Sequence, residues 1–268
     1  MSAQTSEVCL NCQTHLVGAF CHHCGQNSHT QKNPTSHDLV HEIIHEFLHL
    51  DGKIFRTLKV LALKPGQLTI EFLEGQRGRS IGAIRLYLTM SIIYFFLGGA
   101  TPFNNDVQID KKDSTTKIVA DLDIGFPTFE ANVEKKLRKI ETSPEQFIKN
   151  LTNAFPKFVF LLVPLFALFI QWLFRKHRLN YPAYLYFALH LHAAYFMVLA
   201  LLLPFEFLLD TNIFFTIWSG WYLYKALKNV FNTTSKQTLL RIFLIAFSYL
   251  LLFVVAMTGL VGFAIYTL

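Results

Sequence analysis

The sequence predicts an all-α multipass membrane protein with about five transmembrane helices and a small cysteine-rich module at its N-terminus. Hydrophobic residues make up 52% of the chain and charged residues 16%, where a typical soluble domain has about 25% charged residues. Five long apolar runs follow residue 80. All four cysteines lie within the first 24 residues.

The composition indicates the surroundings of the chain. A mean hydropathy of +0.35 over 268 residues requires lipid around much of the surface, so a lipid bilayer is the first expected partner. The formal net charge of +6 is modest, and the basic residues are dispersed around the apolar runs. This pattern is typical of membrane flanks near anionic lipid. Because a soluble basic face is missing from the pattern, we expect no nucleic-acid partner.

Residues 1–30 are polar and contain no apolar core of the kind that a signal peptide needs. The cysteines are arranged as Cys9-x-x-Cys12 and Cys21-x-x-Cys24, with eight residues between the two pairs. Each pair places two thiolates on one cation, and together they complete a tetrahedral sulfur site suited to Zn²⁺. The remainder of the chain has no cysteine, which is not the distribution of a disulfide-stapled secreted protein. We therefore predict a zinc ribbon over these residues.

The expected zinc is structural, because four protein ligands leave no open coordination position for a substrate or water. Gly25, directly after the last cysteine, lets the backbone turn so that its amides can point at sulfur. The alternatives for these cysteines are four unconnected thiols, an iron–sulfur cluster and a redox-active cysteine pair.

Residues 31–80 are predicted to form a linker and an amphipathic juxtamembrane helix. Apolar side chains recur at helical spacing from Leu39 to Leu61, and Pro65-Gly66 ends the pattern. This helix is too polar to span a bilayer, so it should lie on the membrane surface or pack against the other helices. The arginines of the segment Gly75–Arg79 either approach a phosphate together with nearby backbone amides or form an ordinary basic membrane flank.

A row of histidines lies on the same predicted helix. His41, Glu42 and His45 match H-E-x-x-H, and the motif repeats with His49, while His37 extends the row. On a helix this spacing places two imidazoles and a glutamate on one face, as in a zinc metallopeptidase. We favour a second interpretation, the polar edge of an amphipathic helix, because the motif is short and lacks a recognisable third ligand. Whether the row binds a metal is left open.

Residues 81–268 form the predicted transmembrane domain, interrupted by a hydrophilic insertion at about 101–156. A helix needs roughly 20 residues to cross the hydrocarbon, with about 17 as the lower bound. The fourth run is short and rich in aromatic residues, so whether residues 213–227 span fully is left open. The five runs are Ala83–Ala100, Phe158–Phe174, Tyr184–Leu209, Ile213–Leu227 and Leu239–Leu268.

The distribution of basic residues predicts the orientation. Arg175–Arg178 lies between the second and third runs, and bases from Lys225 to Arg241 surround the loop between the fourth and fifth. The hairpin at 210–212 has no base. Because basic loops stay in the cytoplasm, the N-terminus should be cytoplasmic and the C-terminus extracytoplasmic. A reducing compartment for the four thiols agrees with this orientation.

The third run contains His190-Leu191-His192. Ionisable groups inside a membrane are candidates for function, and these two, with Glu206, could line a path for a carried molecule. Residues two apart point about 200° away from each other on a helix, so the pair cannot chelate one ion alone. The alternative is two neutral histidines that form hydrogen bonds across helices.

Five segments in this order resemble a bacterial membrane family, the domain of unknown function 3667. They are Cys9–Gly25, Pro65-Gly66, Gly75-x-Arg77, Phe160–Leu168 and Phe187–His192. The resemblance extends over nearly the whole chain. It implies an N-terminal zinc ribbon, several membrane helices and a location in the bacterial cytoplasmic (inner) membrane. It implies no established activity and no catalytic residue.

Three hypotheses for the function follow. The first is a non-enzymatic membrane protein with a docking or scaffold role, in which the ribbon contacts a protein partner. The second is a membrane metalloenzyme that uses the His41/His45 helix, and the third is a carrier of a lipid or small molecule. We favour the first, with Cys9, Cys12, Cys21 and Cys24 as metal ligands and with no catalytic residue assigned.

Overall fold

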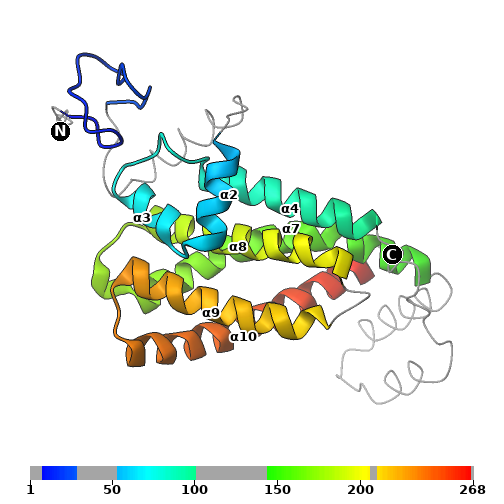
Figure 1. Cartoon of the computed structure of the whole chain (residues 1–268). Helices are drawn as coiled ribbons and strands as arrows, with labels where there is room; N and C mark the ends of the chain where they lie inside the picture. The colour runs from blue at the N-terminus through cyan, green and yellow to red at the C-terminus, as the bar shows by residue number, and fades with distance from the viewer. Residues whose placement is uncertain (1–7, 29–52, 101–143, 206–209, 267–268) are drawn as a thin grey trace. The chain divides into compact units, whose positions relative to one another are not determined.

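The computed structural model describes residues 8–28, 53–100, 144–205 and 210–266 (Figure 1). The described residues are mostly helical and contain seven α-helices. They divide into two compact units, Met1–Gly98 with Val163–Ser248, and Gly99–Leu162 with Tyr249–Leu268. The helices are α2 (Ile54–Leu63), α3 (Gln67–Leu73), α4 (Ala83–Ala100), α7 (Pro144–Leu173), α8 (Tyr181–Leu202), α9 (Thr211–Phe231) and α10 (Ser235–Tyr266).

Helices α2 and α3 form a hairpin around Pro65-Gly66, where the sequence predicts a helix end. Gly66 has a φ of 81°, in the left-handed region that glycine adopts without strain. A Cβ atom at this position would lie 2.8 Å from the Val230 side chain and 3.0 Å from the carbonyl oxygen of Ala226. The turn is therefore packed directly against the C-terminal end of α9. Residues 37–52 of the predicted amphipathic helix lie outside the described residues.

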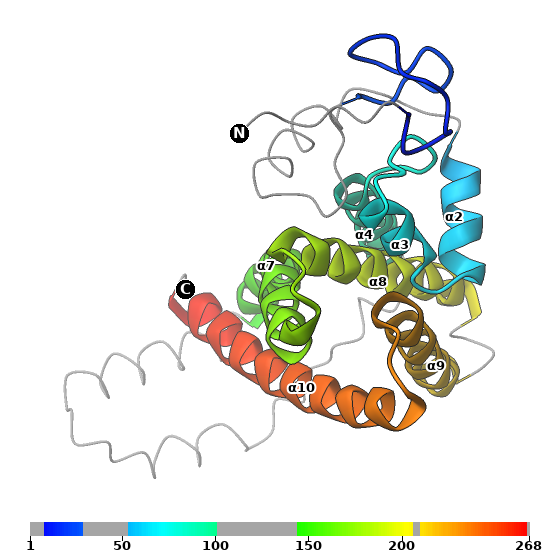
Figure 2. The same cartoon turned by 90° about the vertical axis from the view of Figure 1, so that its left-hand side faces the viewer.

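Helix α8 is the most buried helix of the first unit, and it contacts α2, α3 and α9 (Figure 2). The ring of Phe72 on α3 stacks on Tyr186 of α8 with a centroid distance of 3.5 Å. The hydroxyl of Tyr222 on α9 donates a hydrogen bond of 2.8 Å to the carbonyl oxygen of Leu61. Asn229 donates another, of 2.9 Å, to the carbonyl oxygen of Pro65. The α2–α3 hairpin is thus held by both apolar and polar contacts.

Four helix ends meet in one aromatic cluster. Phe174, just after α7, stacks on Phe231 at the end of α9 at 4.0 Å between centroids. Tyr184, near the start of α8, lies 5.9 Å from the same ring. The guanidinium carbon of Arg241, near the start of α10, lies 4.2 Å from the centroid of Phe174. The basic segment Arg175–Arg178 and the α9–α10 loop are therefore at the same end of these helices.

The second unit contains parts of α7 and α10. The rings of Phe158 and Phe263 lie 6.5 Å apart between centroids, and Leu260 is fully buried. A Cβ atom at Gly259 would lie in ordinary contact with Phe158, 3.8 Å away. The absence of a side chain at Gly259 thus lets α10 pack close to α7 at this point.

Two helices among the described residues are long and apolar enough to cross a membrane, Tyr181–Phe205 and Ser235–Phe263. Only 6% of the apolar window in Ser235–Phe263 is buried, which is unlike the core helix of a soluble protein. Residues 83–98 and 158–173 are shorter apolar helical stretches. The structure thus supports two of the five predicted spans by length and composition, and the other three stay predictions.

The fourth and second predicted runs lie within longer helices. The short fourth run lies inside a longer helix, α9, of 21 residues. The second run is the C-terminal part of α7, which already begins at Pro144. Residues 144–156 of the predicted insertion are therefore helical, and residues 101–143 lie outside the described part of the chain.

Candidate metal centre

The first cysteine pair lies on a tight turn closed by backbone hydrogen bonds. The backbone amide of Cys9 donates a hydrogen bond of 2.8 Å to the carbonyl oxygen of Thr14, and the backbone amide of Gln13 donates one of 2.9 Å to the carbonyl oxygen of Cys9. An antiparallel bridge between Val8 and His15 flanks the turn. The turn directs the side chains of its two cysteines to the same side.

The second pair repeats this turn twelve residues later. The backbone amide of Cys21 donates a hydrogen bond to the carbonyl oxygen of Gln26, and the backbone amide of Gly25 donates one to the carbonyl oxygen of Cys21, both at 2.8 Å. Phe20 and Asn27 form the matching antiparallel bridge. Gly25 has the positive φ expected of it, 73°, and Gln13 adopts a φ of 63° at the equivalent place in the first turn. Sequence reasoning missed the role of Gln13, for which its position after C-x-x-C is the only signal.

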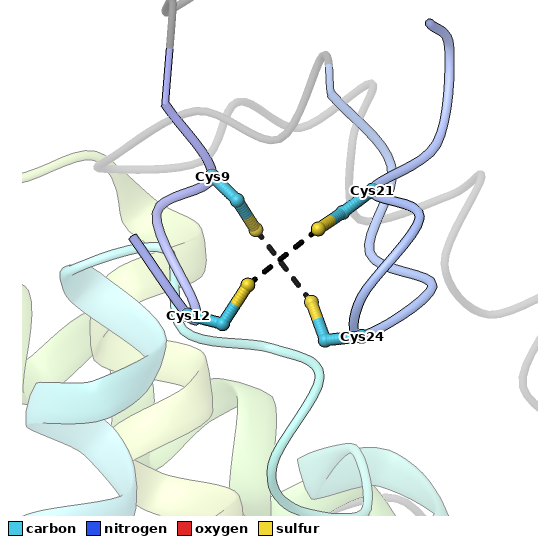
Figure 3. Close-up of side chains that lie close together, drawn as sticks. All are labelled: Cys9, Cys12, Cys21 and Cys24. Atoms are coloured by element: carbon cyan, nitrogen blue, oxygen red, sulfur yellow. Dashed lines mark hydrogen bonds between the residues drawn. The ribbon is translucent and has the colours of Figure 1, made fainter. Parts of the chain in front are cut away.

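The four sulfur atoms point towards a common centre (Figure 3). The Sγ atoms of Cys9 and Cys24 lie 3.6 Å apart, those of Cys12 and Cys21 lie 3.5 Å apart, and all four lie within 4.8 Å of one another. A tetrahedron with Zn–S bonds of about 2.3 Å has edges of about 3.8 Å. The cluster therefore fits a zinc ion bound by four thiolates, and the donor set could hold this metal.

The cysteines differ in burial and acidity. Burial raises the pKa of the Cys9 thiol to about 11. The Thr14 hydroxyl, 3.3 Å from the Cys12 sulfur, forms a hydrogen bond that lowers the pKa of Cys12 to about 5. Four converging thiolates would repel one another, so a bound cation is needed to stabilise all of them in the charged form. Cys12 is thus a more acidic thiol than Cys9.

The segment Gly75–Arg79 is close to the ribbon. The backbone amides of Arg77 and Gly78 both donate to the side-chain oxygen of Gln26, at 3.1 and 3.0 Å. These two amides are therefore already satisfied, which argues against the phosphate site considered from the sequence. The guanidinium of Arg77 lies over the ring of Phe72, 4.5 Å from its centroid.

His190 and His192 are buried but do not converge on one point. His190 Nδ1 lies 3.0 Å from the Thr69 hydroxyl on α3, a hydrogen bond across helices of the kind expected. His192 Nδ1 donates to the carbonyl oxygen of Ala188 within its own helix, at 2.8 Å. The other residues of the two alternative sites, Glu206 and the row of His37, His41, Glu42, His45 and His49, lie outside the described residues.

The described residues thus form a helical protein with candidate membrane spans and a four-cysteine cluster that could bind a metal. A family model described as "Protein of unknown function (DUF3667)" matches residues 51–95, which confirms the resemblance found in the sequence. The function of this family is unknown. Comparison with curated proteins and with solved structures gave no match.

The matched segment includes α2, α3 and most of α4. It contains Pro65-Gly66 and Gly75-x-Arg77 but not the cysteines. In the structure it is the part of the chain that contacts both the ribbon, through Gln26, and the helices α8 and α9.

Proposed function

We propose that the chain is a non-enzymatic integral membrane protein in which a cytoplasmic zinc ribbon has a docking or scaffold role. The observation that carries the proposal is the convergence of four cysteine sulfurs within 4.8 Å. Four thiolates complete the coordination of zinc, so such a site stabilises the local fold and leaves no coordination position for a substrate.

Helix lengths support five membrane spans. The helices α4, α7, α8, α9 and α10 have between 18 and 32 residues. At about 1.5 Å per residue they are roughly 27 to 48 Å long, against about 30 Å of hydrocarbon. Each of α4, α7, α9 and α10 also exposes large apolar side chains that lipid would cover. Examples are Ile92 and Phe96, Leu168 and Trp172, Ile213 and Ile217, and Phe243 and Phe247.

The basic residues at the end where α7, α8, α9 and α10 meet support a cytoplasmic location for the ribbon. The basic segment Arg175–Arg178 and Lys236 lie near the aromatic cluster at this end, whereas the 210–212 hairpin has no base. Because basic loops remain in the cytoplasm, this end should face it. The α2–α3 turn packs against the same end of α9 at Val230. The family resemblance implies that the membrane is the bacterial inner membrane.

The metal content of the purified protein tests the proposal. We expect about one zinc per chain, unchanged when His41 and His45 are both replaced by alanine and lost when the four cysteines are replaced by serine. A second metal that disappears with the two histidines would instead support the metalloenzyme. Zinc that remains without the cysteines would refute the proposed site.

A further inference from the structure

Gln26 joins the ribbon to the loop before α4. Its side-chain nitrogen donates a hydrogen bond of 2.7 Å to the carbonyl oxygen of Gly75. Its side-chain oxygen accepts from the amides of Arg77 and Gly78, at 3.1 and 3.0 Å. One amide side chain therefore satisfies three backbone groups of a single loop, and it is buried in doing so.

The same residue is part of the second cysteine turn. Its carbonyl oxygen accepts the hydrogen bond from the amide of Cys21, and it lies two residues after Cys24. The position of Gln26 therefore depends on the conformation of the turn that presents these two sulfurs. Since a cysteine turn without its metal loses the cross-link that fixes it, metal binding and the position of Gln26 are coupled.

A second contact comes from the first cysteine turn. Asn11, between Cys9 and Cys12, is buried, and its side chain lies against Gly78. A Cβ atom at Gly78 would lie 2.7 Å from Asn11 Nδ2 and 3.1 Å from Asn11 Cγ. An alanine at this position would therefore have to displace the side-chain amide of Asn11. Both cysteine turns contribute one side chain to the contact.

The loop is in turn fixed to the helices. Arg77 covers the ring of Phe72, which stacks on Tyr186 of α8. The guanidinium of Arg56 on α2 donates to the carbonyl oxygen of Arg79 at 2.6 Å and pairs with Glu71 at 3.2 Å. A change in the ribbon can therefore reach the helical hairpin through one short loop.

We propose that the Asn11/Gln26 face of the ribbon binds the chain's own segment 75–78, and that this contact closes only when metal is bound. The inference rests on the proposed zinc site. The first partner of the ribbon is then a segment of the same chain, and zinc occupancy controls how firmly that segment is held.

Tryptic cleavage after Arg77 and Arg79 in the full chain, reconstituted in detergent or nanodiscs, measures the state of this contact. The zinc-loaded protein should be protected there. Chelation of zinc should speed cleavage at these sites by about tenfold or more, because three hydrogen bonds are lost together. Cleavage after Lys176, in the exposed α7–α8 segment, should not change and is the internal reference.

Two variants separate the contact from the metal site. Gln26→Ala should keep one zinc per chain and still be cleaved about tenfold faster after Arg77 and Arg79. Gly78→Ala should do the same from the loop side, because its Cβ would displace Asn11. His23→Ala and Gly18→Ala are matched controls in the ribbon, since His23 is exposed and a Cβ at Gly18 meets no atom within 4 Å.

The outcomes distinguish the proposed zinc site from the proposed contact between the ribbon and residues 75–78. If zinc is bound by the four cysteines but Gly78→Ala and chelation leave the cleavage rate unchanged, the proposed contact is wrong and the zinc ribbon stands. If Gln26→Ala loses zinc, Gly78→Ala alone decides, because it leaves the ribbon's sequence intact. If no zinc is bound at all, the proposed function fails together with the coupling.

Discussion

Replacement of Gly66 by alanine should destabilise the docking of the α2–α3 hairpin on α9. The backbone at this residue is left-handed, with a φ of 81°, which costs about 1 to 2 kcal/mol for a residue with a side chain. The new Cβ would lie 2.8 Å from Val230 Cγ2 and 3.0 Å from the Ala226 carbonyl oxygen, and such overpacking costs about 1 to 3 kcal/mol. The free energy of unfolding should fall by roughly 2 to 5 kcal/mol.

The matched control is Gly220→Ala on α9. A Cβ at Gly220 meets nothing within 4 Å, and the residue lies inside the helix, so alanine should leave stability unchanged or raise it slightly. Thermal unfolding of both variants in detergent, followed by circular dichroism, gives the comparison. A Gly66→Ala protein that melts with the wild type would show that the turn is not packed on α9 as described.

The remaining predictions concern the metal site and the membrane. Cys21→Ser should release zinc and expose residues 1–30 to protease, while circular dichroism should show that the membrane helices remain folded. Thr14→Val should weaken zinc binding at pH 6 but hardly at pH 9. Without the hydroxyl the pKa of Cys12 rises from about 5 towards its ordinary value, so zinc must displace a proton from nearly every Cys12 thiol at pH 6 but from far fewer at pH 9. Equal losses of zinc affinity at both pH values would contradict a role of Thr14 in the ionisation of Cys12. Reporter fusions at residues 130 and 268 should both report an extracytoplasmic location, and a cytoplasmic signal at 268 would mean that α9 does not span or that the orientation is reversed.

The four-cysteine cluster could be predicted from the sequence because its members lie close together in the chain. Two C-x-x-C pairs lie within 16 residues, Cys9 to Cys24, and each pair is presented by a turn of known geometry. The long helices could be predicted for a similar reason, because a long apolar run by itself indicates a helix that is shielded from water. The end of α2 at Pro65-Gly66 follows from the local chemistry of these two residues.

Contacts between distant segments could not be predicted in this way. Gln26 and Gly75 are 49 residues apart, and a neutral amide side chain gives no sequence signal for the backbone it will meet. The small space beside Gly78 is set by the side chain of Asn11, which belongs to another turn. The spacing of His190 and His192 already predicts that their side chains point in different directions. The hydrogen bond between His190 and Thr69, in contrast, depends on the packing of α8 against α3, which the sequence does not reveal.

The contact between ribbon and loop limits how the ribbon could serve as a docking module. Asn11 and Gln26, two of its buried polar residues, already face the segment 75–78. A protein partner that binds this face must first displace the loop, and so it should increase tryptic cleavage after Arg77. A partner that binds elsewhere on the ribbon leaves the loop protected. Residues 8–28 contain no Asp, Glu, Lys or Arg, so outside the metal–thiolate centre this segment has few charges, and either kind of binding should depend only weakly on salt. Loss of binding at high ionic strength would mean that a partner contacts the basic ends of the helices instead of the ribbon.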